Sequence, residues 1–80
     1  MTRFLLHNHH EPGECGVTFA AFKGHASPLR RRKTASSCLM GGHEIWWLVE
    51  AETADAALAL LPGYVAERST AMPIRTVLIP

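Results

Sequence analysis

The stretch TASSCLMGGHEIWWLVE, residues 34–50, decides the fold that this sequence predicts. Two runs rich in strand formers flank Gly41-Gly42, a dipeptide that suits the positive φ angles of a two-residue hairpin turn. In that register Cys38 faces Ile45 on the neighbouring strand. Strand alternation divides the side chains between two faces, with Cys38, Met40, His43, Ile45 and Trp47 on one and Leu39, Glu44, Trp46 and Leu48 on the other.

The residues before this hairpin predict a strand and a short helix. Residues 3–9 alternate as a strand does, and Pro12-Gly13 ends that strand. Residues 14–23 then predict a helix, which Gly24 closes. The apolar spacing i, i+4, i+7 puts three side chains on the buried face of this helix: Cys15, Phe19 and Phe22.

The residues after the hairpin predict a second helix and a last strand. Thr53 is a suitable N-cap, and the helix continues to Leu61. At Pro62-Gly63 it must kink or restart. The closing run PIRTVLIP, residues 73–80, predicts a strand, and Pro73 at its start suits an edge position.

The resulting element order is strand, helix, strand, strand, helix, strand, within one domain over residues 1–80. Right-handed crossovers and the hairpin favour an α+β, ferredoxin-like fold with a four-stranded antiparallel sheet. Its strand order is 4-1-3-2, and both helices lie on one face. Much of the other face is expected to be apolar, so that a second copy of the chain covers it.

In these features the chain resembles the dimeric α/β-barrel superfamily of small proteins. The resemblance rests on the length, the element order, the stretch IWWLVEAETADAALALLPGYV at residues 45–65 and the closing apolar run. That superfamily includes muconolactone-isomerase-like and YCII-like domains, cofactor-poor monooxygenases and small nickel-binding proteins. The resemblance implies a homodimer with a cleft between sheet and helices.

The composition excludes several classes of protein. With 48% hydrophobic and 19% charged residues, the 80-residue chain is an ordinary globular sequence. A net charge of +1 gives no general attraction to nucleic acid or anionic lipid, so neither is an expected partner. No apolar stretch approaches the roughly 18 residues of a membrane span, and the N-terminus lacks a secretory segment. A cytoplasmic location is therefore expected, with Cys15 and Cys38 as thiols, although a disulfide stays possible.

A candidate metal site comes from the histidines of LLHNHHEPGEC, residues 5–15. His7 and His9 leave one face of a strand, and the predicted topology brings that strand end close to His43 and Cys38. Three imidazoles with sulfur from Cys38 or Met40 suit zinc, copper, nickel or iron. The register that decides whether His7 and His9 share the face of His43 is left open.

Other polar residues of this stretch have simpler interpretations. His10 is expected to be a solvated loop residue or a replacement ligand. Glu11 and Glu14 are expected to serve the helix N-terminus, where acidic groups are stabilised by the helix dipole. Cys15 is expected to be a small core residue. If its thiol lies at the helix N-terminus beside a histidine, a lowered pKa would make it reactive.

The run Arg30-Arg31-Arg32-Lys33 is the only cluster of charge in the chain. Four cations could contact phosphates, but no aromatic or glycine-rich segment accompanies the run. A solvated loop leading into an edge strand is therefore the preferred interpretation, since positive charge there discourages edge-to-edge pairing.

Three functions remain open from the sequence. The first is a small homodimeric protein that binds a transition metal for storage, sensing or metal-assisted catalysis, with His7, His9, His43 and Cys38 as ligands. The alternative is a metal-free enzyme of the isomerase or monooxygenase kind. In it His7 or His9 is the general base toward a small apolar ligand in a sheet–helix pocket. The third is an interaction module without chemistry of its own.

Overall fold

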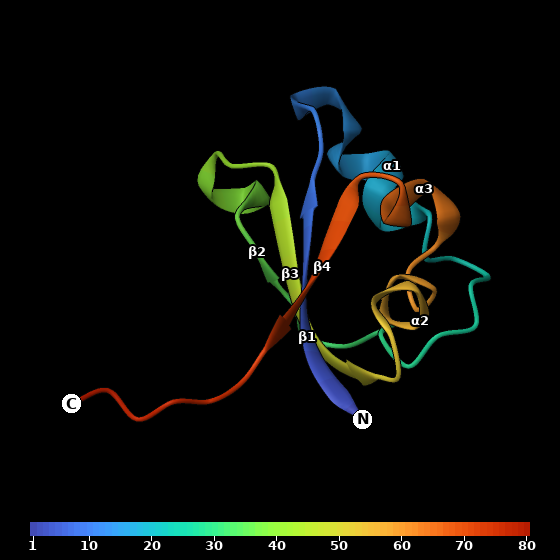
Figure 1. The fold of residues 1–80 in the computed structure, drawn as a ribbon. Helices are drawn as coiled ribbons and strands as arrows, with labels where there is room; N and C mark the ends of the chain where they lie inside the picture. The colour runs from blue at the N-terminus through green and yellow to red at the C-terminus, as the bar shows by residue number, and fades with distance from the viewer.

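A computed structural model describes all of residues 1–80 and has an α+β fold with a four-stranded antiparallel sheet (Figure 1). The strands are β1 (Thr2–His9), β2 (Ala35–Ser36), β3 (Glu44–Ala51) and β4 (Ser69–Ile74), in the order β2-β3-β1-β4. The α-helices are α1 (Cys15–Ala20), α2 (Ala54–Leu58) and α3 (Gly63–Ala66). Two short 3₁₀ helices are η1 (Pro12–Glu14) and η2 (Cys38–Met40). The predicted α+β class and antiparallel sheet are confirmed.

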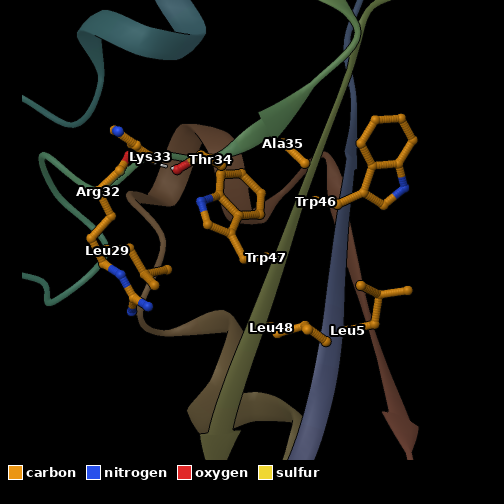
Figure 2. Close-up of a pocket in the computed structure, with 9 residues that line it drawn as sticks. All are labelled: Leu5, Leu29, Arg32, Lys33, Thr34, Ala35, Trp46, Trp47 and Leu48. Atoms are coloured by element: carbon orange, nitrogen blue, oxygen red, sulfur yellow. Dashed lines mark hydrogen bonds between the residues drawn. The ribbon is translucent and has the colours of Figure 1, made fainter.

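The core lies between the helices and one face of the sheet. Alternate residues of β1 and β3 supply most of it, as strand geometry requires. The buried apolar residues are Phe4, Leu6, Leu29, Ile45, Trp47, Val49, Ala51, Ala57, Leu61 and Val65. The two tryptophans therefore separate, with Trp47 on the helix side and Trp46 on the opposite face (Figure 2).

That opposite face carries large apolar side chains with no layer over them. Leu5 lies between Leu48 on β3 and Met72 on β4 in the strand register. Leu48 is 57% exposed and Met72 is 60% exposed. A row of three such side chains across neighbouring strands forms a continuous apolar strip.

The predicted two-residue hairpin turn is wrong. Ser36 pairs with Ile45, and the N–H of Ser37 donates to the carbonyl of Glu44 over 3.0 Å, so the connection spans residues 38–43. Cys38 therefore does not face Ile45. A type I′ turn needs positive φ at both central residues, and of the two glycines only Gly41 has it, at 88°.

The cause of this longer connection is a local fold around Ser37. Its carbonyl accepts the N–H groups of Met40 and Gly42, each over 2.9 Å, so the chain turns back as η2 before the glycines. Met40 is consequently 87% exposed and does not face His43 across a strand pair.

The first helix is shorter than predicted and presents a different face. The α-helical geometry begins at Cys15 and ends at Ala20, after the 3₁₀ turn of η1. In this short helix Thr18 is the fully buried residue, while Phe19 is 47% exposed. Phe22 does pack against the core, as predicted.

The second helical region follows the prediction at its N-cap and at its interruption, but the helix ends three residues before the predicted Leu61. The hydroxyl of Thr53 accepts the N–H of Ala56 over 3.1 Å and caps α2. The helix ends at Leu58, and the chain restarts as α3 after Pro62. The interruption expected at Pro62-Gly63 is therefore confirmed.

The last strand lies earlier in the chain than predicted. β4 ends where its pairing with β1 ends, at the pair Arg3 and Ile74. Residues 75–80 are not part of the sheet and extend away from it (Figure 1). Pro73 lies near the end of β4 rather than at its start, on an edge strand that tolerates a missing donor.

Candidate metal centre

Four sulfur and imidazole side chains meet at the end of the sheet where β1 stops: those of His10, Cys15, Cys38 and His43. His10 Nε2 lies 3.3 Å from Cys15 Sγ and 3.2 Å from Cys38 Sγ. The three donor atoms of His10, Cys15 and Cys38 all lie within 4.8 Å of one another. His43 joins through Nδ1, which is 3.2 Å from Cys15 Sγ.

Each of these side chains is placed by the start or the end of an element. His10 directly follows β1, and its N–H donates to the carbonyl of His43 over 3.0 Å, which ties together the ends of the two central strands. Cys15 is the first residue of α1, and Cys38 is the first residue of η2. The long β2–β3 connection is thus what brings Cys38 to the cluster.

The orientation of His10 is set by a hydrogen-bond network under its ring. Asn8 is fully buried, and its Nδ2 donates to the carbonyls of Val65 and Arg68 and to the hydroxyl of Ser69, over 3.1–3.4 Å. Because the amide nitrogen is occupied in this way, Oδ1 is the atom that faces His10 Nδ1 at 2.7 Å. An oxygen there can only accept, so Nδ1 of His10 carries the proton.

The protonation of Nδ1 leaves one lone pair on His10 Nε2, and two thiols point at it. The S–H of Cys38 can donate to that lone pair, and the S–H of Cys15 can donate to Nδ1 of His43 at 3.2 Å. Replacing the thiol protons by a metal ion would satisfy all three atoms at once, since thiolate sulfur and imidazole nitrogen are both good ligands.

Two members of the cluster, His10 and Cys15, have pKa values shifted toward the neutral form. Burial, and then the neighbouring His43, lower the pKa of His10. Burial and the adjacent Cys38 raise the pKa of Cys15. The lowered pKa expected at Cys15 is conditional on a histidine beside the thiol; His10 is there, but burial raises the pKa instead.

Of the ligands predicted from the sequence, the structure brings Cys38 and His43 together and leaves His7 and His9 on the other face. His7 Nε2 lies 2.7 Å from Glu44 Oε1, and its ring stacks on Trp46 with centroids 5.5 Å apart. His9 is exposed. The general base of the metal-free alternative therefore faces away from the helices, and no histidine lines the three surface pockets.

Cys15 and His10 are the cluster members that sequence reasoning missed, and His10 is 2% exposed rather than a solvated loop residue. A signal for His10 existed. The buried positions of β1 are Phe4, Leu6 and Asn8, and continuing this alternation by one step beyond the strand reaches His10.

Comparison with known protein families, characterised proteins and solved structures found no match. None of the helices has both the length and the apolar character required to cross a bilayer. The site must therefore be interpreted from its own geometry.

Proposed function

We propose that this protein binds a transition metal ion through His10, Cys15 and Cys38, with His43 as the fourth ligand. The observation that carries the proposal is the convergence of two sulfur atoms on one imidazole nitrogen whose proton state is set by Asn8. In a tetrahedral zinc site, bonds of about 2.3 Å to sulfur and 2.0–2.1 Å to nitrogen put these atoms about 3.5 Å apart. The three contacts of 3.2–3.3 Å need only a small expansion. His43 contacts Cys15 and lies outside the group of His10, Cys15 and Cys38 whose donor atoms are all within 4.8 Å, so its ring must move closer to complete the site.

The donor set favours zinc among the candidate metals. Two thiolates and two imidazoles are the ligands of closed, tetrahedral zinc sites, and thiolates disfavour magnesium and calcium. Four protein ligands leave no open position for substrate. The proposed role is therefore metal storage, sensing or stabilisation of the fold. Such a site needs reduced thiols, which suits the cytoplasm.

The test is elemental analysis of tag-free protein, combined with zinc titration against a chelating dye. We expect one zinc per chain in the wild type and its loss in Cys38→Ser and His10→Ala. The matched control is the double variant His7→Ala/His9→Ala, which removes the same chemistry from the opposite face. Zinc retained by the control supports the proposal. Zinc lost from the control alone would move the site to His7 and His9.

We also propose that the protein is a homodimer in which two sheets pack face to face, as in ferredoxin-like dimeric α/β barrels. The support is the apolar strip of Leu5, Leu48 and Met72, which packs against nothing within one chain. Light scattering should report twice the mass of the chain. Leu48→Lys should give a monomer, while Val17→Lys on the helix side should not. A monomeric wild type would contradict the dimer and leave the metal proposal untouched.

A further inference from the structure

The loop before β2 lines a second candidate binding site, away from the proposed metal site. It is a pocket of about 330 Å³ between α1, the loop and the helix side of β3. Its apolar lining consists of Phe19, Phe22, Leu29, Ile45 and Trp47. Its polar lining consists of Thr34 and three cations, Arg30, Arg31 and Arg32. Ligand pockets begin at about this size and have this mixture of apolar walls and a few polar groups.

The fold supplies the aromatic partners that the basic run lacks in the sequence. Phe22 packs on Trp47, with ring centroids 6.1 Å apart and a tilt of 39°. Phe19, expected in the core, is instead 47% exposed at this pocket. Figure 2 shows the Trp47 indole directed toward the loop of Leu29, Arg32 and Thr34. An apolar ring entering the pocket would therefore meet aromatic surfaces.

The cations of the loop have no acidic partners within the chain. The ion pairs of the structure involve His7 and Arg68, and none includes Arg30, Arg31 or Arg32. Three arginines line one pocket, and planar guanidinium groups bind anions through paired N–H donors.

The backbone of the loop adds an independent sign of a special role. Arg31 has a φ of 65°, and it is the only residue other than glycine with a positive φ. A side chain with a Cβ adopts this left-handed conformation at an energetic cost, and such strain gathers at binding and catalytic sites.

A neighbouring pocket of about 340 Å³ continues the same surface around the edge of β3 (Figure 2). It shares Leu29, Arg32, Thr34 and Trp47 with the first pocket and adds Lys33. Lys33 is thus a fourth cation beside the continuous surface of the two pockets. Neither pocket is lined by His10, Cys15, Cys38 or His43.

We propose that the pocket of Phe19, Trp47 and the three arginines binds a small molecule with an aromatic or similarly apolar body and one anionic group. The body packs against the aromatic rings, and the anion lies among the guanidinium groups of the loop. This site is independent of the proposed metal centre, so each can be tested while the other is left intact.

The probe is 2-naphthoate, titrated against the wild-type protein and followed by tryptophan fluorescence and by ¹H–¹⁵N NMR. Neutral 2-naphthalenemethanol is the matched ligand without charge. Because a charge-assisted contact contributes about 1.5 kcal/mol or more, we expect naphthoate to bind roughly tenfold more tightly. The NMR chemical-shift changes should be largest at Phe19, at Trp47 and in the loop before β2. Equal affinity for the neutral ligand, or shifts elsewhere, would overturn the proposal.

The variants separate this pocket from a general effect of charge. Arg31→Gly keeps the left-handed backbone accessible, and Arg30→Gln changes an exposed side chain, so both should fold. Each should weaken naphthoate binding severalfold. Arg75→Gln removes the same charge outside the pocket and should leave binding unchanged. Equal losses in all three variants, or displacement of naphthoate by an equal concentration of inorganic phosphate, would show an unspecific anion surface and refute the proposed site.

Discussion

The side-chain oxygen of Asn8 lies 2.7 Å from Nδ1 of His10, and this contact directs the other ring nitrogen of His10 toward Cys15 and Cys38. A partner of this kind fixes the tautomer and the ring orientation of a ligating histidine. The proposed metal site therefore depends on a residue that offers no ligand of its own.

Replacing Asn8 should separate this orienting role from its structural role. Asn8→Leu removes the acceptor for His10, and loss of such a partner lowers metal affinity by about 10–100-fold. Asn8→Asp keeps an acceptor but loses the amide donor to Val65 and Ser69, so it should lose stability while retaining more of the zinc affinity. Dye competition and chemical unfolding measure the two effects. Equal zinc affinities in the two variants would contradict the orienting role.

The close packing at Gly42 predicts a remote effect on the metal centre. A Cβ added there would lie 2.7 Å from Cβ of Ser37 and closer still to its hydroxyl. Overpacking of this kind costs about 1–3 kcal/mol, and relief requires movement of the residue next to Cys38. Gly42→Ala should therefore lower both stability and zinc affinity.

Gly13→Ala is the control for that substitution, since a Cβ at Gly13 meets nothing within 4 Å. It should change zinc affinity little in the same dye competition. If both variants bind zinc as the wild type does, the β2–β3 connection adapts more readily than its contacts indicate.

The buried hydroxyl of Thr18 predicts a stabilising substitution. This hydroxyl has no hydrogen-bond partner, and its residue is fully buried. Thr18→Val keeps the shape and removes the unpaired polar atom, so the free energy of unfolding should rise by about 1 kcal/mol. Thr53→Val is the same chemical change at the N-cap of α2, and it should lower the free energy of unfolding by about 1 kcal/mol. In chemical unfolding, the denaturant midpoint should rise for Thr18→Val and fall for Thr53→Val, with the m-value unchanged in both.

The contact between Tyr64 and Glu14 predicts a dependence on pH. The N–H of Glu11, and then the Tyr64 hydroxyl at 2.8 Å, lower the pKa of Glu14 below its usual value. A lowered carboxyl pKa adds stability above the unfolded-state value of 4.5, and that stability is lost as pH falls through the folded-state pKa.

Tyr64→Phe removes this hydroxyl and keeps the ring over which Arg68 lies. The variant should be less stable than the wild type at neutral pH, and the difference should shrink below about pH 4. Chemical unfolding at several pH values checks this. A difference that stays constant down to pH 2 would assign the loss to packing.

Local patterns were enough to predict part of this fold. Thr53 and Pro62 act through their own neighbours, so the cap of α2 and the interruption after it follow from sequence. The hairpin loop could not be predicted, because Gly41-Gly42 is compatible with a tight turn as well as with the observed connection. The hydrogen bonds of Ser37 decide between them, and these form only when the chain has folded back.

The candidate site was predicted in part for a related reason. Cys38 and His43 flank the hairpin connection, so topology alone brings them to one end of the sheet. His10 was missed because it lies beyond the residues that pair as a strand, where the inward direction depends on the backbone bond to His43. Neither Cys15 nor His10 carries a local pattern that marks it as a ligand.

The alternation of β1 has a consequence for regulation. It assigns His7 and His9 to the surface that a second copy would cover and His10 to the interior, although all three lie within four consecutive residues. The proposed dimer surface and the proposed metal site therefore use different side chains. We therefore expect dimerisation and zinc binding to be thermodynamically uncoupled. The dimer dissociation constant should not depend on zinc, and the zinc dissociation constant should not depend on protein concentration.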